Sequence, residues 1–184
     1  KDRYYLNPAY EEVHDLILNV VSEIAQNYKI DGLHMDDYFY PDHVDDSFDK
    51  MDYMYSETDL SIEDWRRNNV NVFVKQAYDT VKGINPEMKF GVSPFGIWKN
   101  DDGKNGGSAT RGMQSYFSIY CDPLAWAEGG YIDYLAPQIY WRFSTEAAPF
   151  GELARWWNRM LDGTGVDFLV SHAAYNYDVW SSPE

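Results

Sequence analysis

The chain carries two carboxylates and an imidazole between residues 34 and 37. They are His34, Asp36 and Asp37, in the run DGLHMDDYFYP at residues 31–41. Glycoside hydrolysis ordinarily needs two carboxyl groups, one as general acid and one as nucleophile or as base for water. We take Asp36 as the candidate nucleophile or stabilising carboxylate. Because a neighbouring negative charge raises the pKa of one member of a carboxyl pair, the Asp36/Asp37 pair could also supply an acid.

A buried strand is predicted to deliver these side chains, because the stretch 30–39 is short, apolar and bounded by polar turns. Side chains alternate along a strand, so His34 and Asp36 point to one side and Asp37 to the other. We expect His34 and Asp36 to share the site, with Asp37 supporting it from behind or capping a neighbour. The alternative is an acidic strand end that caps a helix or binds a structural ion.

Later strand ends carry further candidates for sugar binding. Trp98 ends the segment GVSPFGIW at residues 91–98 and could be a sugar-stacking platform, the alternative being core packing. Gln138 and Tyr140 share parity near the end of another predicted strand, so both can face the same cleft as partners for hydroxyl groups. His172 lies near the end of the last predicted strand, where a structural role is the alternative.

Composition narrows the classes of partner. The 184 residues carry a formal charge of −15, which disfavours nucleic acid and anionic membrane surfaces. The 16 Tyr and 7 Trp suit a saccharide cleft, because sugar rings stack on aromatic rings.

Cys121 is the only cysteine, so an internal disulfide and a zinc-thiolate site are excluded. We expect no membrane span, no metal and no cofactor, and the first residues do not resemble a signal peptide.

The predicted elements alternate between helix and strand. Helices are expected from Asn7 with Pro8 in its first turn, from Ser61 with a capping box to Asp64, over 114–128 with a break at Asp122, and around Leu153–Leu161. Strands are expected over 30–39, 89–98, 132–141 and 167–174, and the stretch 41–60 is expected to be a long loop.

This order predicts an α/β fold with a parallel sheet. A doubly wound sheet and a β/α barrel compete, and the barrel is favoured because no Gly-rich nucleotide motif follows a strand and the polar residues gather at strand ends. Four β/α units are half of an eight-unit barrel. We therefore expect a single domain over 1–184 that is one part of a TIM barrel, or a half-barrel that self-associates.

Several long motifs, in order, resemble the glycosyl-hydrolase-like ten family. They are the run at 31–41, DWRRNNVN at 64–71, KFGVSPFGIW at 89–98, YLAPQIYW at 134–141 and SHAAY at 171–175. The resemblance implies a bacterial TIM-barrel hydrolase of the periplasm, cell envelope or secreted type that acts on a polysaccharide or a peptidoglycan glycan strand. It makes these strands the fourth to seventh of eight.

By that match, Asp36 takes the catalytic position at the end of the fourth strand, with His34 and Asp37 beside it. The substrate-binding candidates then include Tyr38, Tyr40, Trp141 and Tyr175 as well as Gln138 and Tyr140. The first motif is also similar to the chitinase-type pattern Asp-Gly-x-Asp-x-Asp-x-Glu. His34 replaces an Asp of that pattern and Tyr38 stands where its acidic Glu would be, which argues against a substrate-assisted chitinase mechanism.

Two other functions remain open at this level. A metal-dependent polysaccharide hydrolase or deacetylase could use His34, Asp36 and Asp37 as ligands, although a second histidine at a matching position is not evident. A non-catalytic glycan-binding barrel could keep the aromatic cleft without the second acid, since fold and function separate readily in barrels.

Overall fold

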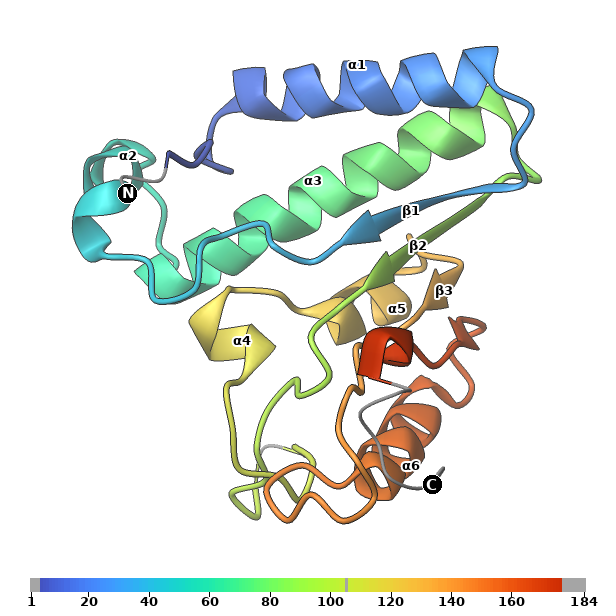
Figure 1. Cartoon of the computed structure of the whole chain (residues 1–184). Coiled ribbons are helices and arrows are strands. Elements are labelled where there is room, and N and C mark those ends of the chain that lie inside the picture. Colours follow the sequence, from blue (N-terminus) through green and yellow to red (C-terminus); the bar gives the residue numbers. More distant parts are fainter. Residues whose placement is uncertain (1–3, 105, 177–184) are drawn as a thin grey trace.

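A four-stranded, all-parallel sheet organises the computed structural model, which describes residues 4–104 and 106–176 (Figure 1). The strands lie in the order β1-β2-β3-β4, so each strand pairs with the next one along the chain. Their bounds are Gly32–Asp36, Lys89–Ser93, Tyr134–Leu135 and Asp167–Phe168. Parallel neighbours joined by helical crossovers are the repeating unit of a β/α barrel. The predicted α/β class and partial TIM-barrel architecture are confirmed.

The helical elements lie between and around these strands. They are α1 (Glu11–Asn27), η1 (Asp46–Phe48), α2 (Lys50–Tyr55), α3 (Ile62–Ile84), α4 (Ser115–Ser118), α5 (Pro123–Gly129), α6 (Phe150–Leu161) and η2 (Ala174–Asn176). Figure 1 shows α1 and α3 running side by side along the sheet, with α6 beside the later strands.

The first helix begins later than the sequence predicted. Asn7 was expected to cap it, but α1 starts at Glu11 and the Asn7 Oδ1 atom accepts from the Ala9 N–H in a preceding turn. Its apolar residues also divide between two faces. Val21 and Ala25 are buried against the rest of the protein, whereas Leu16, Val20 and Ile24 are exposed along the outer face.

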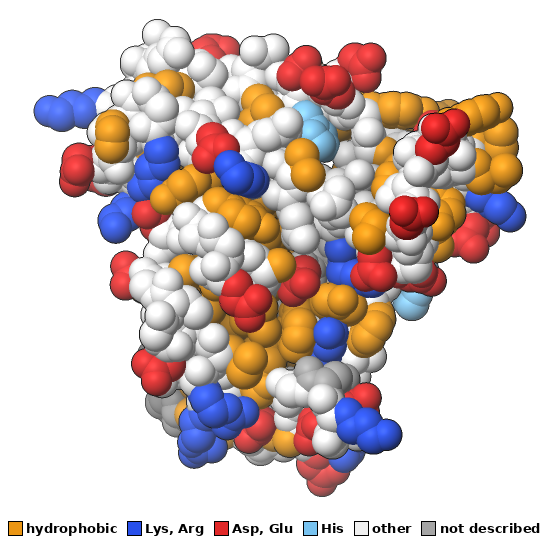
Figure 2. Space-filling view, turned by 180° about the vertical axis from the view of Figure 1, so that it is seen from behind, with side chains coloured by type: hydrophobic (Ala, Val, Ile, Leu, Met, Phe, Trp, Pro, Cys, Tyr) orange, Lys and Arg blue, Asp and Glu red, His pale blue; other side chains and the backbone are white. Residues whose placement is uncertain are grey.

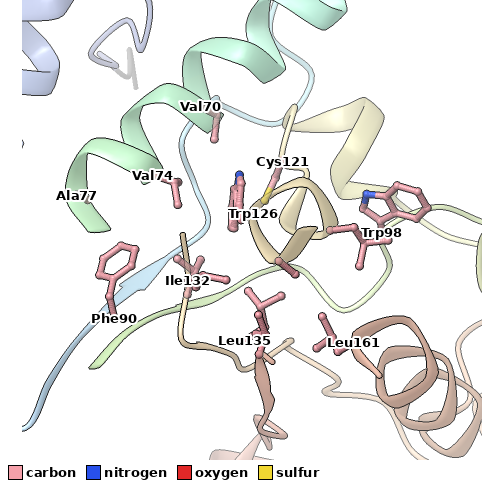
Figure 3. Packing of buried hydrophobic residues seen from close by; sticks show 14 of the residues in the cluster. Val70, Val74, Ala77, Phe90, Trp98, Cys121, Trp126, Ile132, Leu135 and Leu161 are labelled. Atoms are coloured by element: carbon pink, nitrogen blue, oxygen red, sulfur yellow. The ribbon is translucent and has the colours of Figure 1, made fainter. Parts of the chain in front are cut away.

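The long helix α3 follows the sequence closely. The Ser61 Oγ atom accepts from the Asp64 N–H at 3.1 Å, so the predicted N-cap forms, but the Asp64 carboxylate accepts from the Ser61 hydroxyl at 2.9 Å and not from the Ser61 N–H that a full capping box requires. One face of α3 then packs on the sheet. Figure 3 shows Val70, Val74 and Ala77 of this helix pointing toward Phe90 and Trp126 in the core. This packing fixes the helix behind the first two strands.

The stretch 41–60, predicted to be an irregular loop, contains η1 and α2. The Asp45 carboxylate accepts from the Ser47 N–H and starts the 3₁₀ turn. Just before α2, Asp49 is 1% exposed and forms a two-point ion pair with the buried Arg66 of α3. The short helix is therefore fixed by a tertiary ion pair, which periodicity along the sequence cannot reveal.

The strands are shorter than predicted, and their ends leave regular pairing as irregular segments that still meet. Phe95 bridges to Gln138 and Gln138 bridges to Ser171, beyond the ends of the named strands. The predicted break at Asp122 is present between α4 and α5, but Asp122 does not cap with its side chain, which accepts from the Trp98 indole instead.

Acidic side chains are spread over the face seen in Figure 2, with hydrophobic side chains gathered near its centre. Among the helices of residues 4–104 and 106–176, none is long and apolar enough to cross a bilayer.

Candidate active site

The two adjacent aspartates at the end of β1 differ in their exposure to solvent. Asp36 is exposed, whereas the Asp37 side chain is 1% exposed. The Asp37 carboxyl group accepts from the N–H of Phe95, two residues after the end of β2, which joins the segments that follow the two strands. The alternation predicted for this pair is not confirmed, because β1 ends at Asp36 and both carboxyl groups lie near the Gln138 amide and contact each other. Burial still distinguishes them: Asp37 supports the site from within the protein, and Asp36 is the member of the pair that a substrate can reach.

Burial changes the acidity of the Asp37 carboxyl group. Removal from water and, after it, the neighbouring Asp36 carboxylate together raise the pKa of the Asp37 carboxyl group to about 7, against the opposing effect of the Phe95 N–H. The Asp37 carboxyl group is therefore largely protonated below pH 7. Its pKa would suit a general acid, but its side chain is buried away from solvent.

Gln138 connects this pair to the third strand. Its Nε2 atom donates to the Asp36 Oδ1 atom at 2.7 Å and to the Ser93 carbonyl at 3.0 Å, and it lies 3.5 Å from the Asp37 Oδ1 atom. The ends of β1 and β2 and the segment after β3 thus converge on one amide group. Gln138 was predicted to bind sugar hydroxyls, but its amide nitrogen is occupied by protein acceptors.

His34 lies one layer deeper on the same side of the sheet as Asp36. Its two ring nitrogens lie 2.6 Å from the Ser93 Oγ atom and 3.0 Å from the Tyr134 hydroxyl. Partial burial lowers the pKa of the imidazole, and the Asp36 carboxylate opposes that shift. The ring also stacks on Tyr134 with centroids 5.6 Å apart. His34 and Asp36 share one face as predicted, but both ring nitrogens of His34 are occupied by protein groups.

Tyr134 is able to occupy this position because of a glycine opposite it. A Cβ atom on Gly91 would collide with the Tyr134 ring, so the absence of a side chain at this position in β2 makes room for the ring. Ser93 and Tyr134 were not among the predicted site residues. A signal for Tyr134 was available, because it lies four residues before Gln138 and therefore has the same strand parity. Ser93 is placed at the site by its parallel pairing with Asp36, which the sequence alone does not give.

Tyr38 and Tyr140 lie near the Asp36 carboxylate, and Tyr175 lies beside Tyr140. Tyr38 and Tyr175 are 64% and 76% exposed, and Tyr140 is at the margin of exposure with its ring 6.5 Å from that of Tyr175. Burial raises the pKa of Tyr140, and the Asp36 carboxylate adds to that increase. These rings lie where the sequence predicted substrate contacts and present accessible aromatic surface.

A pocket of about 330 Å³ opens beside β1 and includes Asp36 and Tyr38 in its lining. The rest of its wall is mainly apolar and comes from the N-terminal segment and α1, together with Met35, Phe39 and Phe73. His34 and Gln138 do not line it. Asp36 therefore borders this pocket on one side. On its other side lie the polar side chains of His34, Ser93 and Gln138.

Two predicted aromatic contacts are buried instead. Tyr40 is 0% exposed and packs edge-on against Phe48 and Tyr120. Trp98 is 8% exposed, stacks on Trp156 and donates its indole N–H to Asp122. The expectation that Trp98 forms an exposed sugar platform is therefore wrong, because helix packing covers its ring. Tyr40 likewise offers no free surface.

The two remaining candidates lie at the margin of the site. Trp141 is partly buried and packs edge-on against Phe95, while His172 is exposed and stacks on Phe150 with centroids 5.4 Å apart. No hydrogen bond joins either side chain to Asp36 or Asp37 within the described part of the chain. In the same residues no group of three or more His, Cys, Asp and Glu side chains is placed to hold a metal ion.

Comparison with known proteins gives a consistent result. A family model described as "Glycosyl hydrolase-like 10" matches residues 1–182. The chain is similar to Glycosyl hydrolase YngK of Bacillus subtilis, with 40% identity over 193 aligned residues that cover 100% of this chain and 38% of the relative. It is equally similar to Glycosyl hydrolase DigH of Escherichia coli K12, with 40% identity over 176 residues that cover 95% of this chain and 40% of the relative. The chain thus spans about two fifths of the length of these relatives.

Proposed function

The chain belongs to the glycosyl hydrolase-like 10 family, and we propose that it forms part of a glycoside hydrolase in which Asp36 is the reacting carboxylate. The observation that carries the proposal is the position of Asp36, an exposed carboxylate at a strand end, bordered by accessible tyrosine rings. In a β/α barrel, strand ends on this side form the catalytic face. The printed names of the relatives, both glycosyl hydrolases, support the same class.

The proposed substrate is a polysaccharide or a peptidoglycan glycan strand. Exposed tyrosines suit the apolar faces of sugar rings, and the acidic surface disfavours polyanions. Such a substrate lies outside the cytoplasm, so we also propose a periplasmic, cell-envelope or secreted location. The proposed chemistry assigns Asp36 to stabilise or attack the developing oxocarbenium centre, and Asp37 to hold the end of β2 in place from behind.

Release of reducing ends from polysaccharide and from peptidoglycan glycan strands tests this proposal. We expect Asp36→Asn to reduce kcat by about a hundredfold or more, since the amide cannot supply the negative charge. Asp15→Asn is the matched control, because Asp15 is exposed on α1 and outside the site. Full activity of Asp36→Asn, with the control also active, would remove Asp36 from the reaction.

One observation favours a second candidate, a glycan-binding barrel without turnover. Asp37, the carboxyl group next to Asp36, is buried, so the pair does not present two carboxyl groups to a ligand. Saccharide binding by the purified protein, with no reducing ends released, would select this function. No observation in the described residues favours the metal-dependent alternative.

A further inference from the structure

The contacts of the Gln138 side chain point to a role that sequence reasoning did not assign. Its Nε2 atom carries two hydrogens, and two oxygen acceptors lie close to it, Asp36 Oδ1 at 2.7 Å and the Ser93 carbonyl at 3.0 Å. Both acceptors lack a hydrogen to donate, so the nitrogen of the amide must face them and the Oε1 atom must face away. The orientation of the amide is therefore fixed by its neighbours.

The backbone of Gln138 is held as firmly as its side chain. Its N–H donates to the Pro94 carbonyl at 2.8 Å, and the residue bridges Phe95 on one side and Ser171 on the other. Gly96 contributes by lacking a side chain, since a Cβ atom there would press on the Gln138 carbonyl. The amide thus projects from a point where three segments of the sheet meet, and it has little freedom to follow a ligand.

The two oxygens of Asp36 differ as a result. The Oδ1 atom accepts from the Gln138 amide and from the Asp37 N–H, at 2.7 and 2.9 Å. Among the described residues no N–H or alcohol group donates to the Oδ2 atom, and the Asp37 carboxyl group, when protonated, is the further hydrogen-bond partner of the Asp36 side chain. Two donors on one oxygen fix the rotation of the carboxylate and direct the other oxygen outward.

We propose that Gln138 is a positioning residue that holds the Asp36 carboxylate by its Oδ1 atom and leaves the Oδ2 atom for the substrate. This inference rests on the proposed hydrolase function, because it assigns Asp36 Oδ2 as the reacting atom. It replaces the expectation that Gln138 binds sugar hydroxyls. A misoriented carboxylate lowers the rate through geometry, so the effect falls mainly on kcat.

Two variants separate this role from a sugar contact. Gln138→Met keeps the length of the side chain but lacks the donor, and we expect kcat to fall about tenfold to a hundredfold with KM nearly unchanged. Gln138→Glu places a third carboxyl group beside Asp36 and Asp37. We expect it to be less active than Gln138→Met at pH 7 and to recover activity as the pH falls, because a protonated Glu can donate to Asp36. Gln26→Met, at an exposed position on α1, is the control.

The titratable groups around Asp36 and Asp37 bear on that pH profile. Besides the pair itself they are His34 on β1, Tyr38 after it, Tyr140 after β3 and Cys121 before α5. All are unchanged in the Gln138 variants. A shift of the profile in Gln138→Glu that is absent from Gln138→Met therefore belongs to the introduced carboxyl group.

A crystal structure of Gln138→Met tests the geometry even if the wild-type protein releases no reducing ends. We expect the Asp36 carboxylate to rotate or to lose its single orientation. An Asp36 carboxylate that keeps its wild-type position in that structure would overturn the proposal, as would a Gln138→Met enzyme with raised KM and normal kcat. Absence of activity in the wild-type protein counts against the hydrolase function alone.

Discussion

Asp37 and Asp49 are both 1% exposed, yet the protein surrounds them in opposite ways. Asp49 receives two hydrogen bonds from the Arg66 guanidinium, which is itself buried and also donates to the Tyr120 hydroxyl at 2.8 Å. Among the described residues Asp37 has no cationic partner, and it is met by a backbone N–H, a glutamine amide and another aspartate. The charge of Asp49 is neutralised by its ion pair with Arg66, whereas Asp37 is neutralised by binding a proton.

This difference distinguishes a carboxylate that holds one segment to another from a carboxyl group at the candidate active site. The Asp49–Arg66 pair fixes the segment with η1 and α2 to α3, away from the strand ends. The Asp36/Asp37 pair lies at the strand ends, where a fixed cation would compete with a ligand for the carboxylates. A carboxyl group with a raised pKa and no cation is typical of a functional site, whereas a complete ion pair is typical of a structural one.

The largest effect on stability is expected at the anchor. Arg66→Met leaves Asp49 buried without its partner, and we expect the free energy of unfolding to fall by about 3–5 kcal/mol. Urea denaturation measures this change. The double variant Arg66→Met/Asp49→Asn should recover part of the loss, because it removes the uncompensated charge. A loss below about 1 kcal/mol in the single variant would contradict the assigned burial.

A pH-dependent effect of a few kcal/mol is expected at Asp37. Its folded pKa of about 7 lies above the unfolded value of 3.8, so the folded state binds more protons between these values and stability falls as the pH rises through this window. Above pH 7 the loss is complete. Asp37→Asn should remove this part of the pH dependence, on the order of 2–4 kcal/mol between pH 4 and pH 7. Parallel stability curves for the wild type and the variant, measured by urea denaturation, would show that Asp37 ionises normally.

A third carboxylate extends the comparison to the opposite end of the sheet. The Lys82 Nζ atom donates to Asp133 at 2.9 Å and to the Met88 carbonyl at 2.8 Å, and Asp133 also accepts from the Phe90 N–H. Lys82→Met should cost about 1–2 kcal/mol of stability, because the pair is only partly buried, and should leave the proposed glycan turnover unchanged. A loss of turnover larger than the loss of folded protein would show that this end also serves the reaction.

The smallest effect is expected where α3 begins. Ser61→Ala removes the cap at Asp64, and loss of such a cap costs about 1 kcal/mol. Ser61 lies little more than one helical turn before Arg66, so thermal unfolding of this variant measures how far the anchor depends on the helix start. We expect the Arg66 pair to persist and turnover to stay normal. A destabilisation as large as that of Arg66→Met would mean that cap and anchor act as one unit.

The sequence alone determined the pattern that local forces control. Alternating helices and apolar strands predicted the parallel α/β fold, and the Ser61 cap located the start of α3. Each of these follows from interactions within a few residues, which periodicity and spacing record.

Only the tertiary structure decided which polar and aromatic groups remain accessible. Trp98 and Tyr40 are covered by segments distant in sequence, and α2 depends on an ion pair with Arg66. Gln138 lies 102 residues from Asp36, and nothing local indicates that its amide faces a carboxylate. Burial and long-range hydrogen bonds arise from packing between elements, so a linear pattern can identify the side chains but not the partners they meet.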